Sequence, residues 1–234
     1  MIASVESALR GLLWDKAPRN HRQDPGPFLV RRIVTAVFVL IGAGVLAWSL
    51  GLDAGNPLFY VGTLVLAAVW TIGAFASGPL YLGRIAGPRR PDDLRRPVGG
   101  AIALGLVMAA IFVAGALVVR HIPVLDRQVA SVLEHADQGV TPLLVFITVV
   151  NGVAEELFFR GALYAAIPRH PVAISTAAYT IATLATGNVM LGVAAILLGV
   201  VVGLERRASG GVLAPILTHV TWSTSMLFVL PLIF

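Results

Sequence analysis

The chain has 234 residues, of which 57% are hydrophobic and only 12% are charged. A soluble domain carries about 25% charged residues, so this composition excludes a water-soluble globule and indicates a membrane protein. The formal net charge of +5 does not indicate nucleic-acid binding, because the arginines stand between long apolar runs. Cysteine is absent, which excludes disulfides, thiolate metal ligands and a cysteine nucleophile.

Residues 1–31 precede the first long apolar run and are polar and basic. Within them Ile2, Val5, Leu9 and Leu12 recur at helical spacing, which predicts a short amphipathic helix. Two interpretations stay open, because the stripe is short: a helix at the membrane interface, or a frayed tail. A cleavable signal would place a short apolar stretch near the start, so we expect the first span to be retained.

Apolar runs near the ~20 residues that cross a bilayer recur along the rest of the chain. They predict an all-α fold, a polytopic transmembrane helical bundle with about seven spans in one domain, residues 32–234. The candidate spans are 33–51, 57–83, 98–119, 142–167, 172–186, 189–204 and 211–233. The fifth and sixth are short, so they need tilt or shelter inside the bundle to cross; a re-entrant hairpin of one short pair is the alternative.

Basic residues give the expected orientation. Lysine and arginine concentrate before the first span and between the second and third, which places both regions on the cytoplasmic side. We therefore expect a multi-pass protein of the plasma membrane whose N-terminal segment, 1–31, is cytoplasmic. On the same count the 51–56 turn and the acidic, helical-looking segment 124–138 lie outside.

Ionisable side chains inside the apolar spans are few: Glu155, Glu156 and Arg160 in the fourth and His219 in the last. An ionised group at a helix centre costs at least ~2.5–3.5 kcal/mol, so this cluster is a candidate functional site. Helical geometry places Glu156 and Arg160 on one face and turns Glu155 by ~100°. We expect a Glu156–Arg160 salt bridge, with Glu155 as the general base. A purely structural salt bridge would explain that pair but leave Glu155 without a partner.

Further polar residues share these faces. Asn151 lies one turn before Glu155 and could orient a water or a carbonyl there, while Ser223 lies one turn after His219. A lone histidine is more often a packing residue, but at membrane depth it has few structural explanations. At ~1.5 Å of rise per residue, helix tilt could bring Glu155 and His219 level, so one shared site is expected.

The run Asn-Gly-Val-Ala-Glu155-Glu156-Leu-Phe-Phe-Arg160 resembles the first motif, Glu-Glu-x-x-x-Arg, of the CAAX prenyl protease and bacteriocin-processing (CPBP, or Abi) family of intramembrane endopeptidases. Residues 210–223, which contain His219, resemble its later histidine motif. The resemblance implies a family-like core over 140–234 that hydrolyses peptide bonds with a Glu-activated water. Carried over, it implies that Glu155 activates the water and that His219 serves the later histidine role at the oxyanion.

The chain departs from the family pattern at two positions. The middle motif, Phe-x-x-x-His, has its best match in Tyr179-Thr-Ile-Ala-Thr183, and Ser223 replaces the asparagine that follows the last histidine. A hydroxyl can hydrogen-bond a water, but it cannot take the proton at neutral pH or bind a divalent metal as an imidazole does. The cofactor is therefore left open, with a divalent metal such as zinc as the candidate.

Three functions stay open. The first is an intramembrane endopeptidase, glutamyl or metal-dependent, in which Glu155 works with a water held by Thr183 and with His219. The second is an inactive family member that binds a membrane partner, peptide or lipid, as the threonine at 183 suggests. The third is a conduit for a small solute or ion that uses Glu155 and His219. The expected partners are membrane lipid and a membrane-associated peptide or protein, with no nucleic acid.

Overall fold

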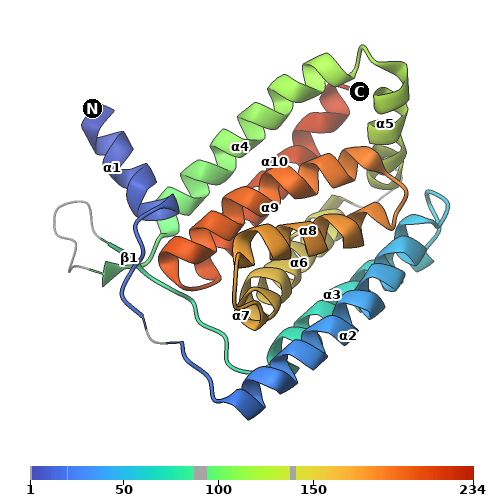
Figure 1. Ribbon diagram of the computed structural model, residues 1–234. Helices are drawn as coiled ribbons and strands as arrows, with labels where there is room; N and C mark the ends of the chain where they lie inside the picture. Colours follow the sequence, from blue (N-terminus) through green and yellow to red (C-terminus); the bar gives the residue numbers. More distant parts are fainter. Residues whose placement is uncertain (1, 20, 87–93, 138–140) are drawn as a thin grey trace.

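A computed structural model describes residues 2–19, 21–86, 94–137 and 141–234. Over these ranges the chain is helical apart from turns, extended segments and a small antiparallel hairpin of β1 (Ile85–Ala86) and β2 (Leu94–Arg95). The expected all-α membrane bundle is confirmed (Figure 1).

Six helices of the described residues are long and apolar enough to cross a membrane. They are α2 (Pro25–Leu50), α3 (Leu58–Ala76), α4 (Val98–Val119), the continuous helix Thr141–Ala166, α9 (Val189–Ser209), and α10 (Leu213–Val229) with its 3-10 end η2 (Leu230–Leu232). A seventh apolar helix, α8 (Pro171–Leu184), has 14 residues. It corresponds to the fifth expected span, which is short as predicted.

The expectation that the sixth span is short was wrong. The α9 helix has 21 residues, because it continues through Glu205, Arg206 and Arg207 to Ser209. It ends at Gly210, whose φ of 73° is the left-handed conformation that commonly terminates helices. Charged residues had marked the expected end of this span, yet Glu205 and Arg206 are buried inside the bundle.

The helix of the two adjacent glutamates runs through the middle of the bundle. It consists of α6 (Thr141–Glu156), the π-helical segment η1 (Leu157–Leu163) and α7 (Tyr164–Ala166). α6 packs against α3 and α10, while α8 packs against α9 and α10 against α4 (Figure 1). The main core gathers around Trp70, whose ring lies 4.7 Å from that of Phe158 and 4.9 Å from that of Phe159.

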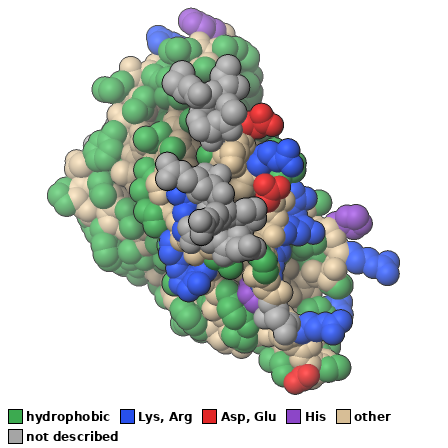
Figure 2. All heavy atoms as spheres, turned by 90° about the vertical axis from the view of Figure 1, so that its left-hand side faces the viewer, with side chains coloured by type: hydrophobic (Ala, Val, Ile, Leu, Met, Phe, Trp, Pro, Cys, Tyr) green, Lys and Arg blue, Asp and Glu red, His purple; other side chains and the backbone are tan. Residues whose placement is uncertain are grey.

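The N-terminal segment is helical and docks on the bundle. α1 (Ile2–Leu13) packs against α9 and α4 and buries Leu12 and Leu13. Beyond it, the Ala17 N–H donates to the carbonyl of Ala208 at 2.9 Å. Of the two interpretations of this segment, the structure therefore shows an attached helix rather than a frayed tail. Figure 2 shows lysine and arginine side chains gathered on the face where α1 lies, beside hydrophobic surface.

The acidic segment expected to be helical forms α5 (Pro123–Asp137). It lies at the end of the bundle away from α1, beside the turn between α2 and α3 (Figure 1). That the α1 end is cytoplasmic stays a prediction.

His21 gives this N-terminal attachment a pH dependence. Its ring stacks on Tyr81 with centroids 3.8 Å apart, and burial together with Arg206 and Arg19 lowers the pKa of His21 from 6.5 to about 4. The unfolded chain therefore binds more protons than the folded chain between these two pH values, so the His21 contribution to stability is fully present above pH 6.5 and falls as pH is lowered toward about 4.

We predict that His21→Phe, which keeps an aromatic ring against Tyr81, flattens the loss of thermal stability between pH 6.5 and about 4. The measurement is the melting temperature of the detergent-solubilised protein across this range. His121→Gln removes an exposed histidine and should leave the slope unchanged. Equal slopes for His21→Phe and the unmodified protein would contradict the assignment.

Candidate functional site

Glu156 is the centre of a buried polar network. Its Oε1 accepts a hydrogen bond from the Arg160 guanidinium at 3.0 Å and lies 2.7 Å from Nδ1 of His219. Glu156 and Arg160 have no exposed surface, and His219 is buried. The expected Glu156–Arg160 salt bridge is present, and within this site His219 lies directly against Glu156.

The helix changes its winding directly after Glu156. Leu157–Leu163 form a π-helical segment, a wide turn that is frequently found at functional sites. The sequence predicts a regular α-helix here, because the spacing of its residues does not reveal the wider turn. The segment keeps Arg160 bonded to Glu156 and places the guanidinium 4.6 Å from the ring centroid of Tyr179 on α8.

Glu155 has a partner that sequence analysis also missed. Its Oε2 accepts a hydrogen bond from the Tyr179 hydroxyl at 2.6 Å. Tyr179 is itself fixed by packing, since its ring lies 4.9 Å from the Phe159 ring and beneath Arg160. Unlike fully buried Glu156, Glu155 keeps part of its surface exposed. Sequence spacing shows no cation beside Glu155, and the donor that the structure places there is a hydroxyl on another helix, 24 residues away.

Three residues expected to support the site, Asn151 and Thr183 near Glu155 and Ser223 near His219, donate hydrogen bonds to their own helices. Thr183 and Asn151 each donate to the backbone carbonyl four residues earlier at 2.9 Å, and Ser223 donates to the carbonyl three residues earlier at 3.3 Å. The Asn151 Oδ1 atom is buried and makes no hydrogen bond within the described part of the chain. A Cβ added at Gly152 would meet His219 Cδ2 at 3.8 Å, so α6 and α10 face each other at this level.

The structure thus brings Glu155, Glu156 and His219 together in one site, with His219 paired to Glu156 and Tyr179 paired to Glu155. Glu155 with Tyr179 and Glu156 with His219 are adjacent pairs on α6, α8 and α10. Thr183 lies one turn beyond Tyr179 on α8.

The donor set does not fit a divalent metal such as zinc. Among the residues that the structure describes, no three histidine, cysteine, aspartate or glutamate side chains gather as a metal site. The His219 Nδ1 faces a carboxylate that already binds Arg160, and the nearby Thr183 offers a hydroxyl where zinc prefers imidazole, thiolate or carboxylate.

The last turn of α9 supplies two charged residues that sequence analysis had placed outside the span. The Arg206 Nε donates to the backbone carbonyl of Arg160 at 2.6 Å. The Glu205 Oε1 lies 2.9 Å from the hydroxyl of Thr218, the residue before His219. Gly210 is the sequence signal that could have located the end of α9, because glycine commonly follows the last turn of a helix. It places Glu205 and Arg206 inside the helix.

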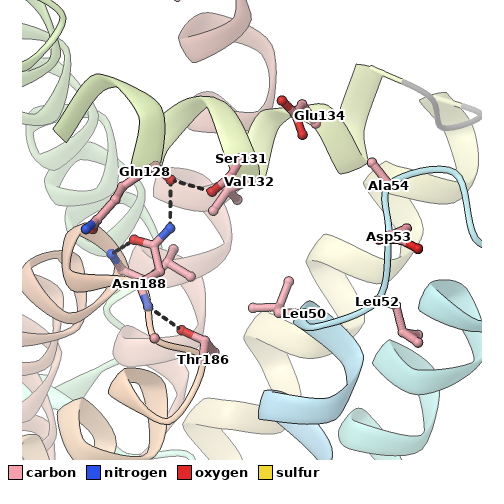
Figure 3. Close-up of a pocket in the computed structure, with 12 residues that line it drawn as sticks. Leu50, Leu52, Asp53, Ala54, Gln128, Ser131, Val132, Glu134, Thr186 and Asn188 are labelled. Carbon is pink, nitrogen blue, oxygen red and sulfur yellow. Dashed lines mark hydrogen bonds between the residues drawn. The ribbon is translucent and has the colours of Figure 1, made fainter. Parts of the chain in front are cut away.

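A separate pocket of about 340 Å³ lies at the α5 end of the bundle (Figure 3). Its polar lining residues are Asp53, Gln128, Ser131, Glu134, Thr186 and Asn188. The Asn188 side chain donates to the Gln128 carbonyl at 2.7 Å, which attaches α5 to the turn between α8 and α9. None of the predicted site residues lines this pocket, whose lining residues Thr186 and Asn188 lie beyond the end of α8 at Leu184.

Comparison with protein families identifies a match in the C-terminal part of the chain. Residues 137–225 match the family described as Type II CAAX prenyl endopeptidase Rce1-like, and this range contains both glutamate pairs, Thr183 and the α9–α10 contacts. Over this segment the chain is similar to CAAX prenyl endopeptidases. The family resemblance drawn from the sequence motifs is confirmed over this segment. No curated protein and no solved structure matches the chain.

The two adjacent glutamates of the CAAX-protease-like segment should differ in their effect on stability. We predict that Glu156→Gln lowers the free energy of unfolding by about 3–5 kcal/mol, because it leaves the buried Arg160 charge without a carboxylate. Glu155→Gln should cost about 1 kcal/mol, since its amide oxygen can still accept from Tyr179. The measurement is equilibrium unfolding in mixed micelles; equal losses for the two variants would show that Glu156 is not the structural member of the pair.

Proposed function

We propose that this protein is an intramembrane endopeptidase that hydrolyses peptide bonds of membrane-associated substrates, with Glu155 as the general base. The carrying observation is the contrast between the two glutamates. Glu156 is fully buried and engaged by Arg160 and His219, whereas Glu155 is partly exposed and accepts a hydrogen bond from the Tyr179 hydroxyl. A carboxylate that is held at one oxygen and accessible at the other suits proton transfer.

Tyr179 fixes the orientation of the base. Because its hydroxyl donates to Oε2 of Glu155, the other oxygen, Oε1, is the one that can accept a proton from a water molecule. The water oxygen then attacks the carbonyl carbon of the substrate, its proton passes to Glu155, and Glu155 returns this proton to the leaving amine as the C–N bond breaks.

Glu156 orients His219 in the same way. A carboxylate at 2.7 Å from Nδ1 favours a proton on that nitrogen. The other ring nitrogen, Nε2, is then not engaged by Glu156 and can face the substrate. If the ring is fully protonated, the Glu156 carboxylate balances its charge, and Nε2–H can donate to the carbonyl oxygen of the substrate as negative charge develops there. This supports the oxyanion role that the family resemblance implies for His219.

Because position 183 is a threonine, the proposed reaction has a single general base, Glu155. Its hydroxyl donates to a backbone carbonyl, so it can accept a hydrogen bond from water but offers no second proton acceptor of useful strength. Glu155 therefore acts without the histidine that the family pattern supplies at this position.

The same threonine supports a second candidate function, an inactive family member that binds a membrane peptide, protein partner or lipid. Thr183 and Ser223, the two residues that depart from the motifs, both direct their hydroxyls to their own backbone. In both cases we propose a location in the plasma membrane with the N-terminus in the cytoplasm, supported by the basic face around α1 (Figure 2).

We predict that Glu155→Gln lowers the cleavage rate by about 10²–10⁴-fold, the range expected for loss of a general base. Tyr179→Phe should lower it less, because the base remains but loses its orientation. Tyr60→Phe, on α3 and outside this cluster, is the matched control and should cleave normally. The assay is mass spectrometry of membrane-anchored peptides incubated with the purified protein in lipid vesicles.

Two outcomes separate the candidates. Full activity of Glu155→Gln would contradict its role as the base. Absence of cleavage by the unmodified protein over a broad peptide panel, with Glu155-dependent cleavage gained by Thr183→His, would instead support the inactive, binding function.

A further inference from the structure

Glu205 is a buried acid that the proposed reaction does not use. It lies in the last turn of α9 with no exposed surface, and its Oε1 is 2.9 Å from the Thr218 hydroxyl. Its Oε2 is buried without a hydrogen-bond partner among the described residues. No lysine, arginine or histidine of the described chain forms an ion pair with it. An uncompensated carboxylate at such a place would cost several kcal/mol, so the charged form is disfavoured there.

The hydrogen bonds of Thr218 also indicate that Glu205 is protonated, because a hydroxyl has only one proton to donate. Its Oγ1 lies 3.0 Å from the backbone carbonyl oxygen of Ala101 and 2.9 Å from the Glu205 carboxyl. A carbonyl oxygen can only accept, and a hydroxyl has one proton to donate. If Thr218 donates to Ala101, the second short contact is satisfied only when Glu205 carries the proton and donates to Thr218.

Close packing of α4 on α10 holds this arrangement in place. A Cβ added at Gly105 would come within 2.7 Å of the Thr218 carbonyl oxygen, so only glycine lets the two backbones approach so closely. The approach brings the Ala101 carbonyl to Thr218. The chain of contacts Glu205, Thr218, Ala101 thus joins three helices at the residue directly before His219.

Arg206, the residue after Glu205, connects α9 to the π-helical segment η1. Arg206 donates to the carbonyl of Arg160, inside the π-helical segment that follows Glu156. Adjacent residues of a helix point ~100° apart, so one turn of α9 reaches both α10 and η1. The separation of Glu156 and His219 therefore depends on contacts made from the same turn.

We propose that Glu205 is a positioning residue: as a neutral carboxylic acid it donates a hydrogen bond to Thr218 and so holds His219 against Glu156. The position of His219 is independent of the reaction, whereas the effect on catalysis rests on the proposed function. Glutamine at 205 can replace the donor through its amide, but leucine cannot.

Two spectroscopic readouts test this without relying on activity. Infrared spectra of the protein in detergent should contain the carbonyl band of a protonated carboxylic acid that disappears in Glu205→Gln and persists in Glu134→Gln, which changes an exposed glutamate of α5. Nuclear magnetic resonance of protein labelled in its five histidines, with the His219 signal assigned by His219→Gln, reports the ring environment. The His219 signal should stay in place in Glu205→Gln and shift in Glu205→Leu.

Thr218 provides a second pair of variants in case Glu205→Leu does not fold. Thr218→Ser keeps the hydroxyl and should preserve the His219 signal, whereas Thr218→Val should shift it. In the cleavage assay, Glu205→Leu or Thr218→Val should lower kcat by roughly 10–100-fold, the usual effect of removing a group that orients a functional residue, with Glu205→Gln near the unmodified rate.

The two proposals can fail separately. A His219 signal that is unchanged in Glu205→Leu and in Thr218→Val would overturn the positioning role, and absence of an acid band that depends on Glu205 would overturn its neutral state. Neither result would affect the assignment of Glu155. Conversely, if the unmodified protein cleaves no peptide, the spectroscopic result still decides the role of Glu205.

Discussion

Placing the Glu156 carboxylate in the middle of an apolar bundle constrains the rest of the structure. A buried carboxylate is tolerated only with a cation and hydrogen-bond donors close by, and Glu156 obtains both from Arg160 and from His219. These partners lie on its own helix and on α10, so the requirement fixes how the two helices pack. Gly152 favours that approach, because a Cβ at this position would come within 3.3 Å of Val220 on α10, the residue after His219. The polar network thus has a structural role, because it fixes how α6 and α10 pack against each other.

This constraint divides two adjacent glutamates between different tasks. Glu156 is committed to holding helices and a histidine in place, and the turn of about 100° between neighbouring residues directs Glu155 toward α8 and Tyr179. Glu155 is left with one orienting donor and partial exposure, the conditions that suit a base. The π-helical segment after Glu156 belongs to the same arrangement, since it holds Arg160 between the carboxylate and the Tyr179 ring.

Sequence patterns predicted what depends on local spacing. The apolar runs predicted the all-α membrane bundle, and the i,i+4 spacing predicted the Glu156–Arg160 contact. Contacts between helices were not accessible in the same way: nothing in the spacing indicates that Tyr179 donates to Glu155. The end of α9 was misplaced because charges are normally excluded from apolar cores, whereas Glu205 and Arg206 are accommodated by partners on α10 and η1 that only the packed structure provides.

The central claim is that Glu155 activates a water molecule that attacks the peptide bond directly. A single turnover in water enriched in oxygen-18, with protein in excess over peptide, tests it most directly. The account predicts one heavy oxygen in the new carboxyl group of the peptide product and none in Glu155, because the oxygen of the water enters the product in the first step. Heavy oxygen in the Glu155 side chain, with an unlabelled product carboxyl, would instead show covalent attack by the glutamate and contradict the account.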